Sequence, residues 1–107
     1  MKMNEKSKAY VGVQNDLFGG MTSTGKIIRD AWIFGLIPET ETCEGWLSGG
    51  IENLWIKVNA EWEKYDFLVD NLPLEIKEKF YRIQDKAYER AKKTGWTPNH
   101  EMSEDSE

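Results

Sequence analysis

Apolar residues in the middle of the chain recur at helical spacing. Between residues 49 and 68 they fall every three or four positions, and at about 100° per residue they form one stripe: Ile51, Leu54, Trp55, Val58, Trp62 and Tyr65. Charged and polar side chains occupy the opposite side of this segment. The pattern predicts an amphipathic helix over 49–68 whose stripe faces a core, with Trp55 and Trp62 packed inside.

A second stripe with the same period follows in residues 73–94. Its members are Ile76, Phe80, Ile83, Ala87 and Ala91. Pro73 suits the start of a helix, where its missing N–H has no partner to lose. Gly95 suits the left-handed position just after a helix. We therefore expect a helix over 73–94.

An earlier segment, residues 24–35, is apolar on nearly all sides. Ile27, Ala31 and Phe34 share one face, and Ile28, Trp32 and Ile33 fall outside it. A helix that is apolar nearly all round is buried on most sides. This predicted helix is therefore either the centre of the domain or part of an interface with another chain.

These segments predict an all-α fold, a small three-helix bundle in residues 21–97. The connections between the helices are short, which favours antiparallel neighbours. Residues 1–20 show no helical period and are expected to form a flexible or irregular N-terminal arm. Residues 98–107 are polar and acidic, and are expected to form a disordered tail. The length of 107 residues suits one domain.

Charge and composition narrow the class of protein. The net charge is −5, and residues 36–70 hold eight acidic and only two basic residues, which argues against binding to nucleic acid. The single cysteine, Cys43, cannot form an internal disulfide. No apolar run approaches the roughly 18 residues that span a bilayer. We expect a cytoplasmic protein that does not bind membranes.

Residues 20–26 match the spacing G-x-x-x-x-G-K of phosphate-binding loops. The match departs from that motif at Ile27, which stands where a magnesium-binding hydroxyl is needed. A threonine, Thr22 or Thr24, is suited to cap the helix that follows. An anion site built from this helix start is retained as an alternative hypothesis, with these residues: Thr22, Thr24, Gly25 and Lys26.

Other candidate chemistry is sparse. The residues with metal-binding side chains, Glu39, Glu41, Cys43, Glu44 and His100, do not have the number or spacing of a metal site. Glutamates near Cys43 raise the pKa of a thiol, which makes it a poor nucleophile. The sequence therefore favours a protein that is not an enzyme and that holds neither metal nor cofactor.

Three large residues of the last predicted helix lie away from its main stripe. Leu74, Tyr81 and Tyr88 recur every seven residues, so either the first helix or the N-terminal arm covers them, or they form a docking face. Trp32 and Trp46 also lie off the stripes. The sequence thus predicts a small accessory or adaptor protein that binds another protein chain, or a second copy of itself, through these residues: Trp32, Trp46, Leu74, Tyr81 and Tyr88.

Overall fold

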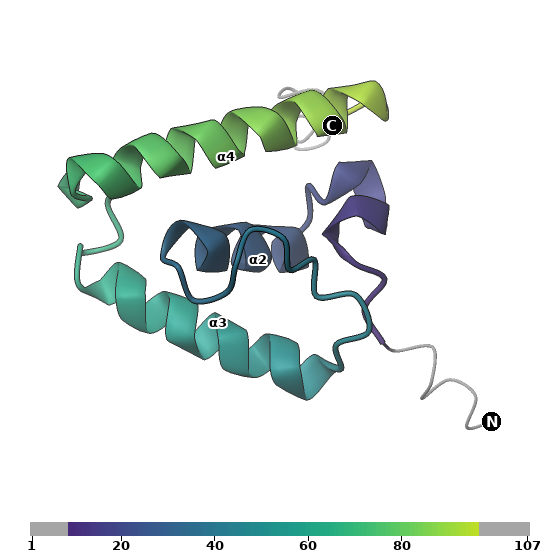
Figure 1. Cartoon of the computed structure of the whole chain (residues 1–107), viewed down its shortest axis with the longest axis horizontal. Helices are drawn as coiled ribbons and strands as arrows, with labels where there is room; N and C mark the ends of the chain where they lie inside the picture. The colour runs from purple at the N-terminus through teal and green to yellow at the C-terminus, as the bar shows by residue number, and fades with distance from the viewer. Residues whose placement is uncertain (1–8, 97–107) are drawn as a thin grey trace, which may run out of the picture.

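A computed structural model of the chain describes residues 9–96 (Figure 1). Within these residues there are three α-helices, α2 (Ser23–Ile33), α3 (Ser48–Glu63) and α4 (Leu74–Lys93), and no strand. Two short 3-10 turns, η1 (Val13–Asn15) and η2 (Leu17–Gly19), precede α2, and a third, η3 (Val69–Asn71), lies between α3 and α4. The predicted all-α fold is confirmed. The predicted disorder of residues 98–107 lies outside the described residues.

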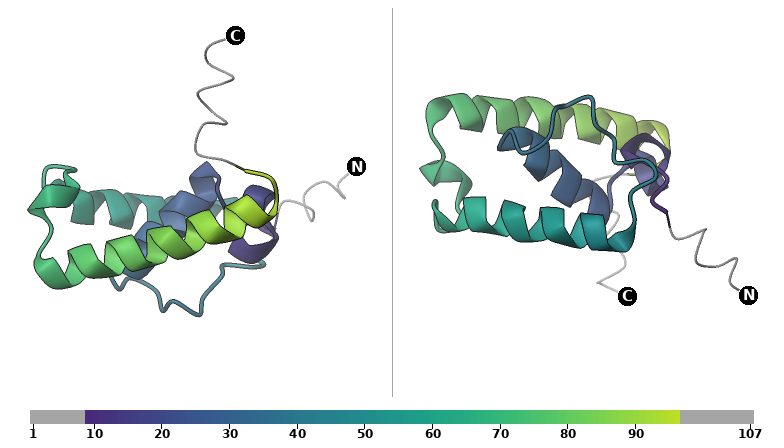
Figure 2. Two further views of the ribbon diagram at one scale, coloured as in Figure 1. Left: turned by 90° about the horizontal axis from the view of Figure 1, so that it is seen from above. Right: turned by 60° about the horizontal axis from the view of Figure 1, so that its bottom comes forward.

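Helix α2 lies between the other two helices. α3 and α4 run in opposite directions on its two sides (Figure 1; Figure 2). Both pack against α2, whereas they make little direct contact with each other. Four apolar residues in the second half of α2 are almost completely buried: Ile28, Ala31, Trp32 and Ile33. Of the two alternatives predicted for this apolar helix, the centre of the domain or an interface with another chain, the structure shows the first.

The two predicted stripes supply most of the remaining core. Leu54, Val58 and Trp62 of α3 are buried, and so are Ile83, Ala87 and Ala91 of α4. The Trp62 ring contacts Phe34 and Phe80 edge-on, with ring centroids 5.2 and 6.4 Å away. The prediction was wrong for Trp55, which is 47% exposed. Trp55 lies at the edge of its stripe, where it lines a hollow together with residues of α2 and α4.

The N-terminal arm is irregular in residues 9–20, and it is part of the core. Val13 is fully buried, and its N–H donates to Thr42 O at 3.1 Å. Asp16 Oδ2 accepts from Tyr10 Oη and from Thr22 Oγ1, both at 2.7 Å. These bonds join the arm to the connector between α2 and α3 and to the start of α2.

Helix α3 is shorter than predicted. It ends at Glu63, because Asp66 and Phe67 adopt left-handed backbone angles with φ of 55° and 59°. The Phe67 N–H donates to Trp62 O at 3.0 Å, which closes the end of the helix. Left-handed angles are uncommon outside glycine, so composition gave no sign of this ending.

The connector of residues 34–47 covers one face of α2 (Figure 1). Trp32 Nε1 donates to Glu41 O at 2.9 Å beneath it. Glu39 forms a two-pronged ion pair with Arg82 of α4, at 3.1 and 2.8 Å. With the connector on this side, the opposite face of α2 remains the one that lies open between α3 and α4.

Candidate functional site

A groove runs along the open face of α2. Its floor in the middle consists of α2 residues Ser23, Lys26, Ile27 and Asp30. Its walls are formed by α3 and α4, and the far end is closed by the segment around η3. This middle part is a hollow of about 500 Å³, walled by Trp55, Val58, Asn59, Trp62, Phe67, Val69, Phe80 and Gln84.

Two further hollows extend this groove. One, of about 510 Å³, lies at the start of α3 and shares Ile27 and Trp55 with the middle part; its other lining residues are Tyr10, Thr24, Trp46, Ser48, Ile51 and Glu52. The other, of about 430 Å³, lies toward the end of α4 and shares Ser23, Lys26 and Gln84; it is also lined by Met21, Thr22, Arg29, Tyr88 and Trp96. We call the three hollows together the α2 groove.

Large apolar side chains are exposed along both walls of the α2 groove. Trp55 and Phe67, which line it, are 47% and 55% exposed. On α4, Tyr88 lines the groove, is 38% exposed and stacks flat on Trp96 with ring centroids 5.6 Å apart. Exposed apolar surface gathered in one concave region is typical of a binding site.

Two of the five predicted partner-binding residues, Trp46 and Tyr88, line this groove, whereas Leu74, Tyr81 and Trp32 do not. Leu74, Tyr81 and Tyr88 are exposed, so neither α2 nor the arm covers them. Trp46 is half-buried and lines the groove at the start of α3. Trp32 differs from the others, because it is only 8% exposed and lies under the connector. It offers no surface to a partner.

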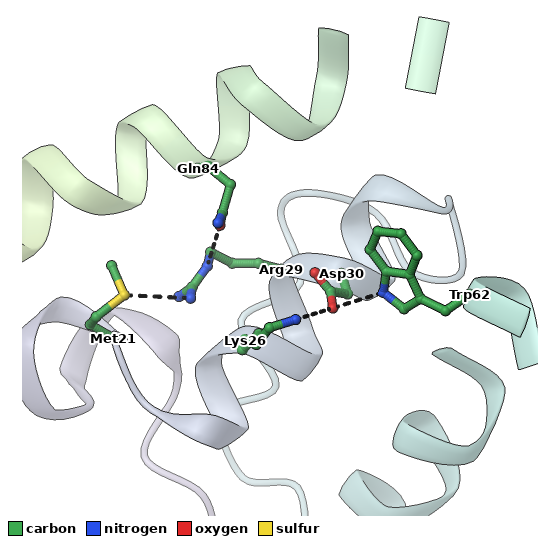
Figure 3. Close-up of polar contacts among 6 residues, drawn as sticks. All are labelled: Met21, Lys26, Arg29, Asp30, Trp62 and Gln84. Atoms are coloured by element: carbon green, nitrogen blue, oxygen red, sulfur yellow. Dashed lines mark hydrogen bonds and ion pairs between the residues drawn. The ribbon is translucent and has the colours of Figure 1, made fainter. Parts of the chain in front are cut away.

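A buried carboxylate lies on the floor of the groove. Asp30 is 4% exposed, and its Oδ2 accepts from Trp62 Nε1 at 3.1 Å and from Lys26 Nζ at 2.9 Å (Figure 3). The Lys26 side chain itself is 63% exposed. The floor thus carries a negative charge that a core indole orients and a solvent-facing ammonium balances.

The neighbouring Arg29 is almost fully buried and joins three segments. Its guanidinium donates to Gly20 O at 2.6 Å. It also donates to Gln84 Oε1 at 3.3 Å and lies 3.7 Å from Met21 Sδ (Figure 3). Burial lowers the pKa of Arg29, against the opposing effect of Asp30. These contacts tie the arm and α4 to the centre of α2.

The groups of the predicted anion site have partners inside the chain. Thr22 Oγ1 accepts from the Gly25 N–H at 3.0 Å, and Lys26 pairs with Asp30. Gly25 lies against the backbone of Gly20, where a Cβ would come within 2.8 Å of the Gly20 carbonyl carbon. Thr24 lines the α2 groove at the start of α3. The glycine spacing that resembles a phosphate loop is therefore explained by a contact between two backbone segments.

Cys43 is fully buried and unpaired. Burial, and then the charge of Glu41, raise the pKa of its thiol to about 11. Within residues 9–96, no three His, Cys, Asp or Glu side chains gather as a metal site. None of the helices in those residues has both the length and the apolar content needed to cross a membrane.

No protein-family model matches this sequence, and no curated protein or solved structure is detectably similar to it.

Proposed function

We propose that this chain is a small accessory or adaptor protein that binds another protein chain in the α2 groove and does not catalyse a reaction. The exposed aromatic side chains along that groove, above all Trp55 and Tyr88, carry the proposal. A long groove between two helices suits an amphipathic helix, whose apolar face would bury them.

Other properties of the chain support this proposal. The groove is lined by two acidic side chains, Glu52 and Asp30, and two basic ones, Lys26 and Arg29, so it lacks the net basic surface that nucleic acid needs. The single thiol, Cys43, forms no disulfide and needs no oxidising compartment, in keeping with a cytoplasmic protein. The anion-binding alternative has less support, because Thr22 and Lys26 already have internal partners.

The proposal is tested by capture of proteins from lysate of the source cells on three immobilised chains. The first is the wild type, the second carries Trp55→Ala and Tyr88→Ala, and the third carries Leu17→Ala. Leu17 is 68% exposed and does not line the groove, so it controls for the loss of an apolar side chain.

We expect a protein that both the wild type and Leu17→Ala retain and the double variant loses. Circular dichroism should show the same helix content in all three chains, since the three residues are exposed. Retention that is equal on all three chains would contradict binding through the groove.

A further inference from the structure

The hollow between the start of α2 and the end of α4 differs in charge from the other two parts of the α2 groove. Glu52 lines the hollow at the start of α3, and Asp30 lines the middle one. Among residues 9–96, no carboxylate lines this third hollow of about 430 Å³, and its two charged lining residues, Lys26 and Arg29, are both basic. This end of the groove therefore favours a ligand that carries negative charge.

Arg29 is a buried cation without a counter-ion. It is 3% exposed, and none of the ion pairs within residues 9–96 includes it. The nearby Asp30 Oδ2 already accepts from Lys26 Nζ and from Trp62 Nε1. A buried charge is normally paired with an opposite charge, because the desolvation of an unpaired charge is costly. Arg29 therefore depends on the neutral groups around its guanidinium.

Two of the three acceptors around this guanidinium are weak. Gly20 O is close, at 2.6 Å from Nη1. Gln84 Oε1 lies 3.3 Å from Nε, and within the described residues the partner of Nη2 is the thioether sulfur of Met21 at 3.7 Å (Figure 3). A thioether is a poor acceptor, and both Met21 and Gln84 line the third hollow. An anion there would replace them along the edge formed by Nε and Nη2, which can bind a carboxylate through two parallel hydrogen bonds.

The rest of the third hollow suits a carboxylate that is flanked by an apolar side chain. The Lys26 side chain is 63% exposed and brings a second positive charge to this hollow. Ser23 lies there in the first turn of α2, where backbone N–H groups and the helix dipole favour negative charge. Tyr88 and the Trp96 ring stacked on it add an aromatic surface. Positive charge beside aromatic rings suits an acidic peptide better than a free anion, because the rings can cover the side chain next to the carboxylate.

We propose that the third hollow binds an Asp or Glu side chain of the partner, whose carboxylate is held by Nε and Nη2 of Arg29 and by Lys26. An apolar residue next to that side chain packs on Tyr88 and Trp96. This inference rests on the proposed function and names the chemistry of the partner, an acidic peptide segment. The site is centred on Arg29, which lies outside the G-x-x-x-x-G-K spacing of residues 20–26, so it does not require a phosphate-binding loop.

Two dipeptides that differ only in charge test the site. Acetyl-Phe-Glu-amide and acetyl-Phe-Gln-amide are titrated into the full isotope-labelled chain, and NMR follows the Arg29 Nε–H and the Ser23 amide. We expect the acidic dipeptide to shift both resonances and to bind about tenfold more tightly than the neutral one, because it forms charge-assisted hydrogen bonds. Equal responses to the two dipeptides, or tighter binding of inorganic phosphate, would overturn the assignment to an acidic peptide.

Gln84→Glu supplies the missing counter-ion from within the chain. The change keeps the shape of the side chain and places a carboxylate where Gln84 Oε1 accepts from Arg29 Nε. This variant should unfold at a higher temperature than the wild type and should no longer distinguish the two dipeptides. Asn53→Asp makes the same change of charge at an exposed position of α3 outside the three hollows, and it should keep the wild-type response. A wild-type response from Gln84→Glu would show that Arg29 does not hold the carboxylate.

Two further measurements identify the source of the carboxylate. In a variant whose acidic residues within 97–107 are changed to amides, unchanged Arg29 and Ser23 resonances would support a second chain as the source. Shifted resonances, with no peptide added, would assign the site to the same chain and overturn the partner. Capture from lysate on Gln84→Glu separates this inference from the proposed function. A protein that the wild type and Gln84→Glu retain equally, and the Trp55→Ala and Tyr88→Ala variant loses, would support binding in the groove and overturn the carboxylate contact.

Discussion

Trp55 and Trp62 lie on the same helix and differ in their surroundings. Trp62 is 7% exposed and donates to the buried Asp30, whereas Trp55 is 47% exposed in the groove. We expect Trp62→Ala to lower the free energy of unfolding by about 3–5 kcal/mol, the usual cost of removing a buried large aromatic. Trp55→Ala should cost only about 1 kcal/mol. Urea unfolding of the two variants measures both, and equal costs would contradict the assignment of Trp62 to the core.

Two glycines at helix starts give a second matched pair. Gly25 lies against the backbone of Gly20, whereas a Cβ on Gly49 would meet no atom within 4 Å. Gly49→Ala should raise the free energy of unfolding by about 0.5–1 kcal/mol, because alanine loses less conformational freedom in a helix. Gly25→Ala should lower it by about 1–3 kcal/mol, because the backbone must move apart. Thermal melts distinguish the two signs.

The buried thiol of Cys43 should react slowly. With its pKa near 11, far less of the thiol is ionised at pH 8 than in the unfolded chain. We expect alkylation by iodoacetamide at pH 8 to be at least about 100-fold slower in the native protein than in urea. Comparable rates in the two conditions would show that Cys43 is accessible.

Among the elements, the two stripes of α3 and α4 were predictable because one face of each helix is covered by α2. Periodicity predicts on which side of its helix a side chain such as Ile83 or Val58 lies, but it does not show how far the neighbouring helix extends. Trp55 was misplaced for this reason, since the edge of a stripe is core only if another helix covers it. The same limit hid the groove, although two of the residues off the stripes, Trp46 and Tyr88, line it. Asp30 was missed because a charged residue in a helix normally indicates a solvent-facing side.

The arm illustrates a different limit. Residues 9–20 form 3-10 turns and extended backbone, which have no side-chain period to read. What holds them is a set of particular partners, such as Asp16 for Tyr10 and Thr22. Such hydrogen bonds depend on the final positions of distant segments, so the sequence predicted an irregular arm and gave no indication of its packing.

The contribution of the N-terminal arm to the free energy of unfolding should decrease at alkaline pH. Burial, and then the hydrogen bond to Asp16, raise the pKa of Tyr10 above its ordinary value of about 10. A folded pKa above the unfolded one gives stability that is present below about pH 10 and is lost as the pH rises further. Urea unfolding should show a steeper loss of stability above pH 10 in the wild type than in Tyr10→Phe. Parallel losses would contradict this role of the phenol.

At the scale of the whole molecule, α2 contacts both long helices and the arm, whereas α3 and α4 barely contact each other. Opening of the fold must therefore expose α2 last. We expect the amides of Ile28–Ile33 to exchange with deuterium most slowly, and those in the first turn of α3 much faster. Mass spectrometry of exchanged peptides in dilute solution tests this order. Exchange of α2 at the rate of the first turn of α3 would show that it is not the centre of stability.

The central place of an early helix also affects synthesis on the ribosome. About 60 residues separate the end of α2 from the end of α4, so at roughly 5–20 residues per second the nascent chain waits about 3–12 s for its last covering helix. During that interval the side chains of Ile28, Trp32 and Ile33 have no permanent cover. The newborn protein is therefore exposed to aggregation, and to capture by chaperones, until α4 has been synthesised.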